Sequence, residues 1–270
     1  MLIEDLIASL ESGLDRRPLT IAQVCIGVFY TVVELSDGQV GAAFTPRDME
    51  DTVCCPRSAA ELPEAGKLSG QSAWDMAQQA LSPSRLCRSV GLATLNALSA
   101  CLMAEKDIPG GRLLSNTDAL DVAHIDAGDK VAMVGAFTPF IRKLKKQDVD
   151  LKIIDKHREA LKGKELSFWV SPDSIAKVMP EADVAIITGS AMVEGGLDGL
   201  LELCKGAHEV VLAGPTASPW PEPFFARGVT VMGGIRVKDS AEFMRLVAEG
   251  GSGYFFSGPA EKIAIVKDKK

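Results

Sequence analysis

The sequence predicts an α/β protein in two parts, an α+β N-terminal domain of residues 1–110 and a Rossmann-like C-terminal domain of residues 113–270 built on a doubly wound parallel sheet. Up to residue 105 the apolar pattern gives a helix, a hairpin and two more helices, in that order. Beyond that point, short apolar runs alternate with helices of crossover length. Between the two patterns lies Glu105–Arg112, which contains Pro109-Gly110-Gly111 and is the strongest linker signal in the chain.

The pattern of apolar residues in the N-terminal part predicts each element of the first domain. In residues 1–14, apolar side chains recur at steps of three and four, which predicts an amphipathic helix. Two strand-like runs follow, Ile21–Leu35 and Gln39–Phe44, and the Asp37-Gly38 step between them is typical of a tight hairpin turn. Two further helices, separated by Pro83, are predicted at Ser72–Leu81 and Arg85–Ala104.

The C-terminal half contains short runs of Val, Ile and Ala, as expected for strands that are buried on both faces of a parallel sheet. These runs are Lys130–Gly135, Leu151–Asp155, Leu166–Val170, Val184–Gly189, Glu209–Gly214 and Val229–Gly233. The helices predicted between or after them are Pro139–Gln147, Asp173–Val178, Leu197–Cys204 and Ala241–Ala248. Connections of this length join parallel strands with a right-handed crossover.

Composition and net charge limit the kinds of molecule that we expect the protein to bind. The net charge of -7 makes the surface repel phosphate backbones, so we expect no nucleic-acid partner. Acidic Glu4 and Asp5 stand where a secretory signal needs positive charge, and the two uncharged stretches, Pro18–Val33 and Ser89–Ala104, are short for a membrane span. We therefore expect a cytoplasmic protein without a membrane partner. Acidic two-domain proteins often form homodimers, and that state stays open.

The six cysteines contain no C-x-x-C pair, so we expect reduced thiols and no preformed metal site. The adjacent Cys54 and Cys55 cannot both easily enter one tetrahedral shell. A soft metal could still arrive within a chelating ligand. The three histidines are more typical of surface or core positions than of a catalytic base, and no catalytic residue or cofactor can be assigned.

The candidate binding residues lie where the predicted parallel strands end, because ligands of open parallel sheets bind outside the carboxyl ends of the strands. The turns there combine Gly or Pro with Ser or Thr. One interpretation is that these residues only end strands and cap helices; for the set together we favour a ligand site. The set comprises Gly135, Pro139, Thr188, Gly189, Ser190, Gly214, Pro215 and Thr216.

The first turn of the predicted sheet lacks the G-x-G-x-x-G fingerprint, because Phe137 and Pro139 add bulk where a pyrophosphate needs close approach. We therefore do not expect ordinary NAD or FAD binding. Asp155, however, lies twenty residues after Gly135, the spacing at which an acidic residue can meet a ribose hydroxyl. Asp155 is thus either the anchor of a nucleoside-like ligand or a solvated turn carboxylate paired with Lys156 or Arg158.

Four segments carry a resemblance to a known family, and they begin with Ser89-Val90-Gly91-Leu92-Ala93-Thr94-Leu95-Asn96-Ala97-Leu98. The others are Val134-Gly135-Ala136-Phe137-Thr138-Pro139, Ile187-Thr188-Gly189-Ser190-Ala191-Met192-Val193 and Gly214-Pro215-Thr216. Over its full length the chain resembles the bacterial and archaeal family described as "Putative heavy-metal chelation". The resemblance implies an N-terminal domain similar to the capping domain of enolase, a Rossmann-like domain, and a cleft between them.

The resemblance also implies a role in handling or making metal chelators. It places Asn96 on the N-terminal side of the cleft, and Gly135, Thr188, Gly189, Gly214 and Pro215 on the other side. Family members often have Asn-Gly-Thr where this chain has Glu194-Gly195-Gly196, so the polarity of the ligand near Glu194 is expected to differ.

Two functions follow from the sequence. The first is the binding of a small polar ligand or metal chelate between the domains, in heavy-metal chelation or in the biosynthesis of metal chelators. The alternative is a transferase or lyase that uses a nucleoside-containing cofactor anchored by Asp155.

Overall fold

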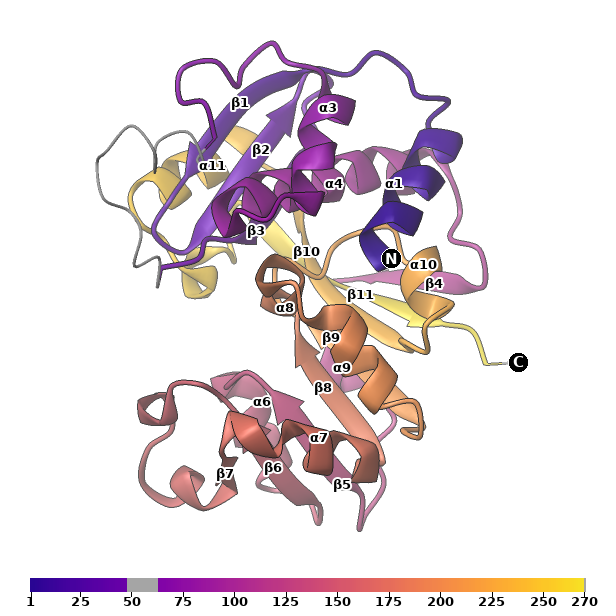
Figure 1. The fold of residues 1–270 in the computed structure, drawn as a ribbon, viewed down its shortest axis with the longest axis vertical. Helices are drawn as coiled ribbons and strands as arrows, with labels where there is room; N and C mark the ends of the chain where they lie inside the picture. The colour runs from indigo at the N-terminus through magenta and orange to yellow at the C-terminus, as the bar shows by residue number, and fades with distance from the viewer. Residues whose placement is uncertain (48–62, 270) are drawn as a thin grey trace.

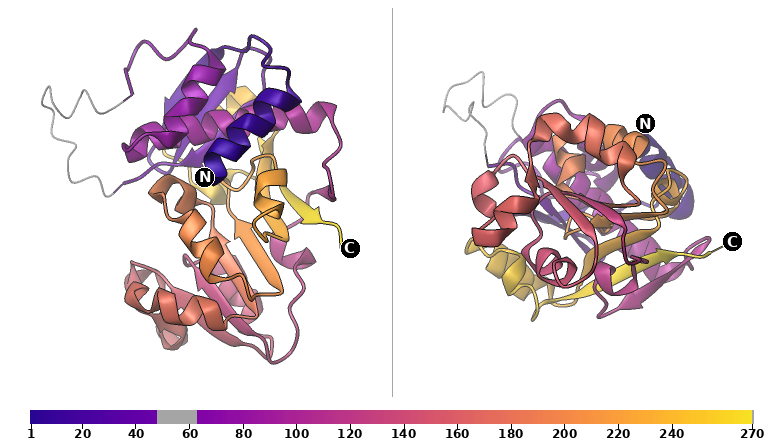
Figure 2. Two further views of the ribbon diagram at one scale, coloured as in Figure 1. Left: turned by 45° about the vertical axis from the view of Figure 1, so that its right-hand side comes forward. Right: turned by 90° about the horizontal axis from the view of Figure 1, so that it is seen from below.

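The computed structural model describes residues 1–47 and 63–269, so Cys54 and Cys55 lie outside the described residues. It contains a three-stranded antiparallel sheet and a separate mixed sheet of eight strands. The small sheet lies with the N-terminal helices at one end of the molecule, and the strands β5–β7 lie at the other (Figures 1 and 2). The α/β class with an α+β N-terminal part is therefore confirmed.

The N-terminal elements follow the predicted order, with one correction. The predicted single strand Ile21–Leu35 is wrong, because the chain turns at Gly27 and forms two strands. A Cβ at Gly27 would lie 2.5 Å from the carbonyl oxygen of Val247, so this turn packs closely against a later helix. The elements are α1 (Leu2–Gly13), β1 (Ile21–Ile26), β2 (Tyr30–Leu35), β3 (Val40–Phe44), α3 (Ala73–Gln78) with the short 3-10 turn Gln79–Leu81, and α4 (Arg85–Glu105).

Helix α4 is the central element of this part. Ser84 caps its first turn, where its side chain accepts a hydrogen bond from the N–H of Cys87. By length and composition alone α4 could cross a membrane, but 83% of its most apolar window is buried inside the protein. A Cβ at Gly41 of β3 would lie 2.1 Å from the carbonyl oxygen of Ala93 in α4. Glycine there lets the helix lie directly on the small sheet.

The small sheet is covered on both faces. Val33 and Ala43 pack with α4, whereas the alternate residue Val32 packs with Phe243 and Val247 of α11 (Ser240–Ala248). We predicted α11 as a crossover helix of the second domain, and it instead covers the outer face of the first sheet (Figure 1). The division into domains 1–110 and 113–270 stays a prediction. The small sheet lies before this boundary and the large sheet after it, but side chains from the two sides pack together.

The large sheet has the strand order β4-β11-β10-β9-β8-β5-β6-β7. Numbered from β5, its six parallel strands lie in the order 3-2-1-4-5-6, typical of doubly wound sheets that bind dinucleotides. Its strands are β4 (Gly111–Ser115), β5 (Lys130–Val134), β6 (Asp150–Ile154), β7 (Trp169–Val170), β8 (Val184–Thr188), β9 (Glu209–Ala213), β10 (Val231–Val237) and β11 (Ala260–Lys267).

Two features of this sheet differ from the prediction. It is mixed, because β11 runs antiparallel to β10 and β4 antiparallel to β11, and neither strand was predicted. Most of the predicted strand Leu166–Val170 belongs to the 3-10 helix Gly163–Phe168, and β7 contains only two residues. Both differences lie at or next to the sheet edges: β4 and β7 are edge strands with one neighbour each, and β11 lies next to the edge between β4 and β10.

Helices cover both faces of the large sheet. Val184 and Ile186 pack with α5 (Ala119–Val122) and α6 (Thr138–Leu144) on one face, while Ala185 and Ile187 pack on the other. The helices of that other face are α7 (Ile175–Val178), α8 (Ser190–Glu194), α9 (Leu197–Leu203) and α10 (Glu222–Phe225). Burial on both sides explains why the central runs read as continuous Val, Ile and Ala.

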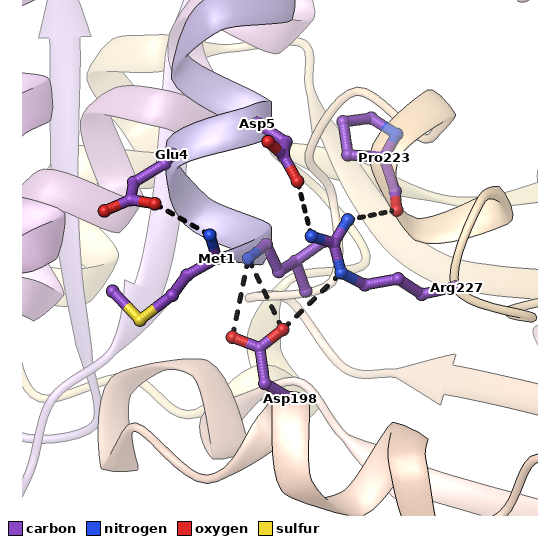
Figure 3. Close-up of polar contacts among 7 residues, drawn as sticks. Met1, Glu4, Asp5, Asp198, Pro223 and Arg227 are labelled. Carbon is purple, nitrogen blue, oxygen red and sulfur yellow. Dashed lines mark hydrogen bonds and ion pairs between the residues drawn. The ribbon is translucent and has the colours of Figure 1, made fainter.

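Helix α1 is also tied to the C-terminal half by polar contacts (Figure 3). Arg227 forms an ion pair with Asp5, and its Nε lies 3.5 Å from Asp198 of α9. The carboxylate of Asp198 accepts the N–H of Leu2 at 3.3 Å. These contacts lie at an exposed surface, and buried apolar side chains of α1 and α10 join the same core.

Candidate functional site

The carboxyl ends of β5, β8 and β9 lie close together at the point where the strand order reverses. A Cβ at Gly135 would lie 3.0 Å from Cβ of Thr188, which shows how closely the ends of β5 and β8 approach. Gly135 and Gly214 both have positive φ, and a Cβ at either would lie 3.7 Å from the ring of Phe137. The ring of Phe137 therefore lies between the two turns. From the sequence, Phe137 was expected to exclude a pyrophosphate and was not among the predicted binding residues.

Hydroxyl groups follow β8 at the same edge. The Oγ1 of Thr188 lies 3.0 Å from Oγ of Ser190 and accepts the N–H of Ser190 at 3.3 Å. Gly189 is buried between them, and a Cβ there would lie 3.1 Å from Cβ of Thr216. Pro139 lies in the first turn of α6 and is exposed. We call the turns at Gly135, Thr188–Ser190 and Gly214 the carboxyl edge.

Asp155 follows β6, the second parallel strand. One carboxylate oxygen accepts the N–H of Ala136 at 2.7 Å, and the other accepts the N–H of His157 at 2.7 Å. The carboxylate thus joins the loops after β5 and β6 and is no simple solvated acid. Lys156, one of its two predicted partners, instead lies 3.5 Å from Glu194. The predicted contact of Asp155 with a ribose stays a prediction.

Asn96 and Thr216 lie in a buried joint between the N-terminal part and the large sheet. Nδ2 of Asn96 donates to the carbonyl oxygens of Ala42 at 2.7 Å and Thr216 at 3.0 Å. Oγ1 of Thr216 accepts the N–H of Phe44 at 2.9 Å, and Ser89 donates to the carbonyl oxygen of Phe44 at 2.6 Å. We call Asn96, Thr216, Ser89 and the ends of β3 that they bind the joint.

Beside the joint is a hollow of about 210 Å³. Asn96, Gly41 and Met103 line it from the N-terminal part, and Ser218 and Ile235 from the large sheet. Its lining does not include Gly135 or Thr188. Asn96 therefore lies at the boundary between the two parts but away from the turn of Gly135, and the cleft that the resemblance implies for both residues stays a prediction. Pro215 contributes its carbonyl oxygen, which accepts the Ser218 hydroxyl at 2.9 Å.

A group of charged side chains surrounds the C-terminal end of α8. Glu194 lies 3.3 Å from Arg85 of α4 and 3.5 Å from Lys156. Arg88 lies next to Gly195, where a Cβ would come within 2.8 Å of Nη1. We call Arg85, Arg88, Lys156 and Glu194 the mouth; Figure 1 shows α8 between the end of β8 and the N-terminal helices. Glu194 was predicted as a binding residue, whereas Arg85 and Arg88 were not predicted and Lys156 was expected only as a partner of Asp155. Two arginines in a first helical turn are unusual and could have indicated this group.

The other titratable groups have local structural partners. His124, His157 and His208 are exposed and lie within 3.3 Å of Asp126, Glu159 and Asp129, respectively. Burial raises the pKa of the Cys101 thiol to about 12 and that of Cys204 to about 11, so neither is a reactive thiolate. Among residues 1–47 and 63–269, no three His, Cys, Asp or Glu side chains cluster as metal ligands.

Two solved structures share this fold. One is a protein of unknown function from the DUF364 family of Pyrococcus horikoshii, with a TM-score of 0.76 and 21% identity over 98% of this chain and 99% of that one. The other, from the same family in Desulfitobacterium hafniense, has a TM-score of 0.75 and 22% identity over 98% of each chain.

Sequence comparison leads to the same group. The chain is 27% identical to an uncharacterized protein of Methanocaldococcus jannaschii over 181 residues, 66% of this chain and 65% of that relative. The chain thus spans slightly less than two thirds of the length of that relative. Residues 7–99 match the DUF4213 family and residues 118–266 match the DUF364 family, both described as "Putative heavy-metal chelation". Because the second match covers more than half of the chain, the protein belongs to the DUF364 family.

Proposed function

We propose that the protein binds a small polar ligand, a metal chelate in the first place, between the carboxyl edge of the large sheet and the N-terminal α+β part. One observation carries the proposal: at the point where the strand order reverses, the glycine turns at Gly135 and Gly214 lie on either side of Phe137, and the turn after β8 lies against Gly135 through Thr188. That is where open α/β sheets bind ligands. The description of both matching families as "Putative heavy-metal chelation" supports a ligand that contains a metal.

The chemistry of the edge favours a chelate over a bare cation. The hydroxyl groups of Thr188 and Ser190 lie at the edge, and the positive charges of the mouth lie beyond it. Such groups bind ligand oxygen atoms, which a chelator presents on its outer surface. The cytoplasm, where thiols such as Cys87 and Cys204 stay reduced, is the proposed location.

Purification without chelators, followed by native mass spectrometry and elemental analysis, tests the proposal. The expected result is a co-purifying small molecule that carries a stoichiometric transition metal. A titration then compares Ni²⁺ alone, citrate alone and the Ni²⁺–citrate complex as probes. Tighter binding of the complex than of either component supports the proposal. Tightest binding of Ni²⁺ alone overturns it, since the protein would then itself supply the ligands of the metal.

The alternative is a transferase or lyase with a nucleoside-containing cofactor. The position of Asp155 after the second parallel strand favours it, because that is where an acidic residue binds ribose in dinucleotide-binding sheets. Each carboxylate oxygen of Asp155 accepts one backbone N–H and can accept a further hydrogen bond. A co-purifying nucleoside without metal supports this alternative over the chelate.

A further inference from the structure

Arg88 in the first turn of α4 has a buried donor atom, Nε, without a hydrogen-bond partner among the described residues. Within residues 1–47 and 63–269, Arg88 forms no ion pair, whereas the neighbouring Arg85 is paired with Glu194. The guanidinium lies against Gly195. This glycine has a positive φ, and a Cβ there would lie 2.8 Å from Nη1 of Arg88. The guanidinium therefore has a backbone on one side, and its Nε has no acceptor among the described residues.

This arrangement is unfavourable for the protein alone. Burial lowers the pKa of Arg88, as expected when a guanidinium loses water without gaining a full partner. The positive end of a helix dipole also disfavours cations, yet α4 has Arg85 and Arg88 in its first turn and no acidic residue there. A guanidinium that neither stabilises its helix nor forms a close ion pair among the described residues has the properties expected of a ligand contact.

The charges of the mouth point to the kind of ligand. Three cations, Arg85, Arg88 and Lys156, surround one carboxylate, Glu194. These four described side chains together are therefore positively charged, on a protein whose net charge is -7. Glu194 lies 3.3 and 3.5 Å from Arg85 and Lys156, whereas it acts on Arg88 through its charge without a close ion pair among the described residues. Arg88 is therefore the cation of this group best able to bind an external group.

We propose that Arg88, with Lys156 near the adjacent Glu194, forms a subsite for an oxyanion group of the ligand, a carboxylate or a phosphate. A guanidinium binds both groups through two parallel hydrogen bonds. The inference rests on the proposed function and names the chemistry of its ligand. Helix α8 has five residues and leads from Ser190 at the carboxyl edge to Gly195. At ~1.5 Å per residue, a ligand about 7–8 Å long would reach from the edge to Arg88.

Calorimetric titration of the full chain tests the subsite with inorganic phosphate, citrate and uncharged glycerol as probes. Wild-type protein is expected to bind at least one anion and not glycerol. Arg88→Gln should weaken that binding about tenfold or more, since a charge-assisted hydrogen bond contributes about 1.5–3 kcal/mol and tenfold corresponds to about 1.4 kcal/mol. Arg88→Lys keeps the charge but loses the planar donors, so its affinity for the anion should lie between those of wild type and Arg88→Gln. Preference for citrate assigns a carboxylate, and preference for phosphate assigns a phosphate.

Arg245→Gln is the matched control, because Arg245 is exposed on α11, across the small sheet from α4. It removes the same charge and should leave the affinity unchanged. Equal affinities of Arg88→Gln and Arg245→Gln overturn the subsite, as does the absence of anion binding by wild-type protein. The proposed function is decided separately, by the molecules that co-purify and by Ni²⁺–citrate. If Arg88→Gln binds that complex as tightly as wild type does, the subsite fails and the proposed function stands.

Discussion

The joint and the mouth both bring polar side chains of α4 against the large sheet, and they differ in whether those side chains have partners. In the joint, the side-chain amide N–H groups of Asn96 bind two carbonyl oxygens, and both polar backbone atoms of Phe44 are bonded. In the mouth, the buried Nε of Arg88 has no acceptor among the described residues. Paired polar groups hold the protein together, whereas an unpaired one costs stability that a ligand can recover. Stability and binding should therefore respond to different residues.

The largest effect is expected at Gly41, where β3 meets α4. A Cβ there would lie 2.1 Å from the carbonyl oxygen of Ala93 and 2.3 Å from the N of Ala97, so the helix backbone has to move. Gly41→Ala should lower the free energy of unfolding by at least about 3 kcal/mol, measured by urea denaturation. The control is Gly199→Ala in α9, where a Cβ would meet no atom within 4 Å and should be neutral or slightly stabilising. Equal effects of the two substitutions would show that β3 and α4 are not closely packed.

Asn96→Ala should have the next largest effect, because two buried carbonyl oxygens lose their donor. We expect a loss of about 2–3 kcal/mol in the free energy of unfolding. Asn96→Asp sharpens the test, since it replaces the amide donor by a carboxylate that faces the same two carbonyl oxygens. At pH 7 it should destabilise the protein more than Asn96→Ala does. A stable Asn96→Asp protein would contradict the assignment of Asn96 to the joint.

Asp155 lies between the two extremes, because its carboxylate is half-buried and accepts two backbone N–H groups. Asp155→Ala leaves both without their acceptor and should cost about 1–3 kcal/mol of unfolding free energy. Asp155→Asn keeps one oxygen acceptor and should cost less. In the same samples, titration with adenosine tests the nucleoside alternative. That alternative requires wild-type protein to bind adenosine at least about tenfold more tightly than Asp155→Asn.

Arg88→Gln should change the free energy of unfolding by less than about 0.5 kcal/mol, although the side chain is partly buried. The reason is that the substitution removes a desolvated charge that lacks a partner. Urea denaturation in buffer without phosphate or carboxylates is the measurement. A loss as large as that of Asn96→Ala would mean that Arg88 belongs to the packing of the protein.

The smallest effect is expected for the exposed contact between α1 and the C-terminal half. The hydrogen bond that Asp5 accepts from Arg227 holds the pKa of Asp5 below its ordinary value. A lowered folded-state pKa contributes stability above the unfolded value, and this contribution is lost as the pH falls below about 4. Arg227→Gln should make the melting temperature fall slightly less between pH 5 and pH 3. An unchanged slope would show that solvent and salt already screen this pair.

The sequence predicted the central elements well, and the reasons are local. The parallel strands β5, β8 and β9 are buried on both faces, so their apolar runs are unambiguous. The edge strand β4 and its neighbour β11 were missed, because Gly111–Ser115 lies beside the linker signal and Ala260–Lys267 mixes charged with apolar residues. The placement of α11 on the first sheet depends on a long-range contact, which periodicity cannot give.

The candidate site was predicted in part. Topology alone brings Gly135, Thr188 and Gly214 to one edge, so the rule for parallel strands was sufficient. Asn96 and Thr216 read like ligand contacts in sequence, and only the structure shows that they bind backbone atoms across the joint. Arg88 and Lys156 come near the same segment, Glu194–Gly195, only in the folded chain, and no spacing in the sequence relates them.

The most direct test of the contrast between joint and mouth is one set of melting temperatures, with and without saturating citrate, for wild type, Asn96→Ala and Arg88→Gln. Wild type should gain about 1.4 kcal/mol of stability at tenfold excess over the dissociation constant. Asn96→Ala should melt at a lower temperature and keep the citrate-induced rise, whereas Arg88→Gln should melt like wild type and lose it. The opposite pattern, in which Arg88→Gln lowers the melting temperature and Asn96→Ala abolishes the rise, would contradict the account.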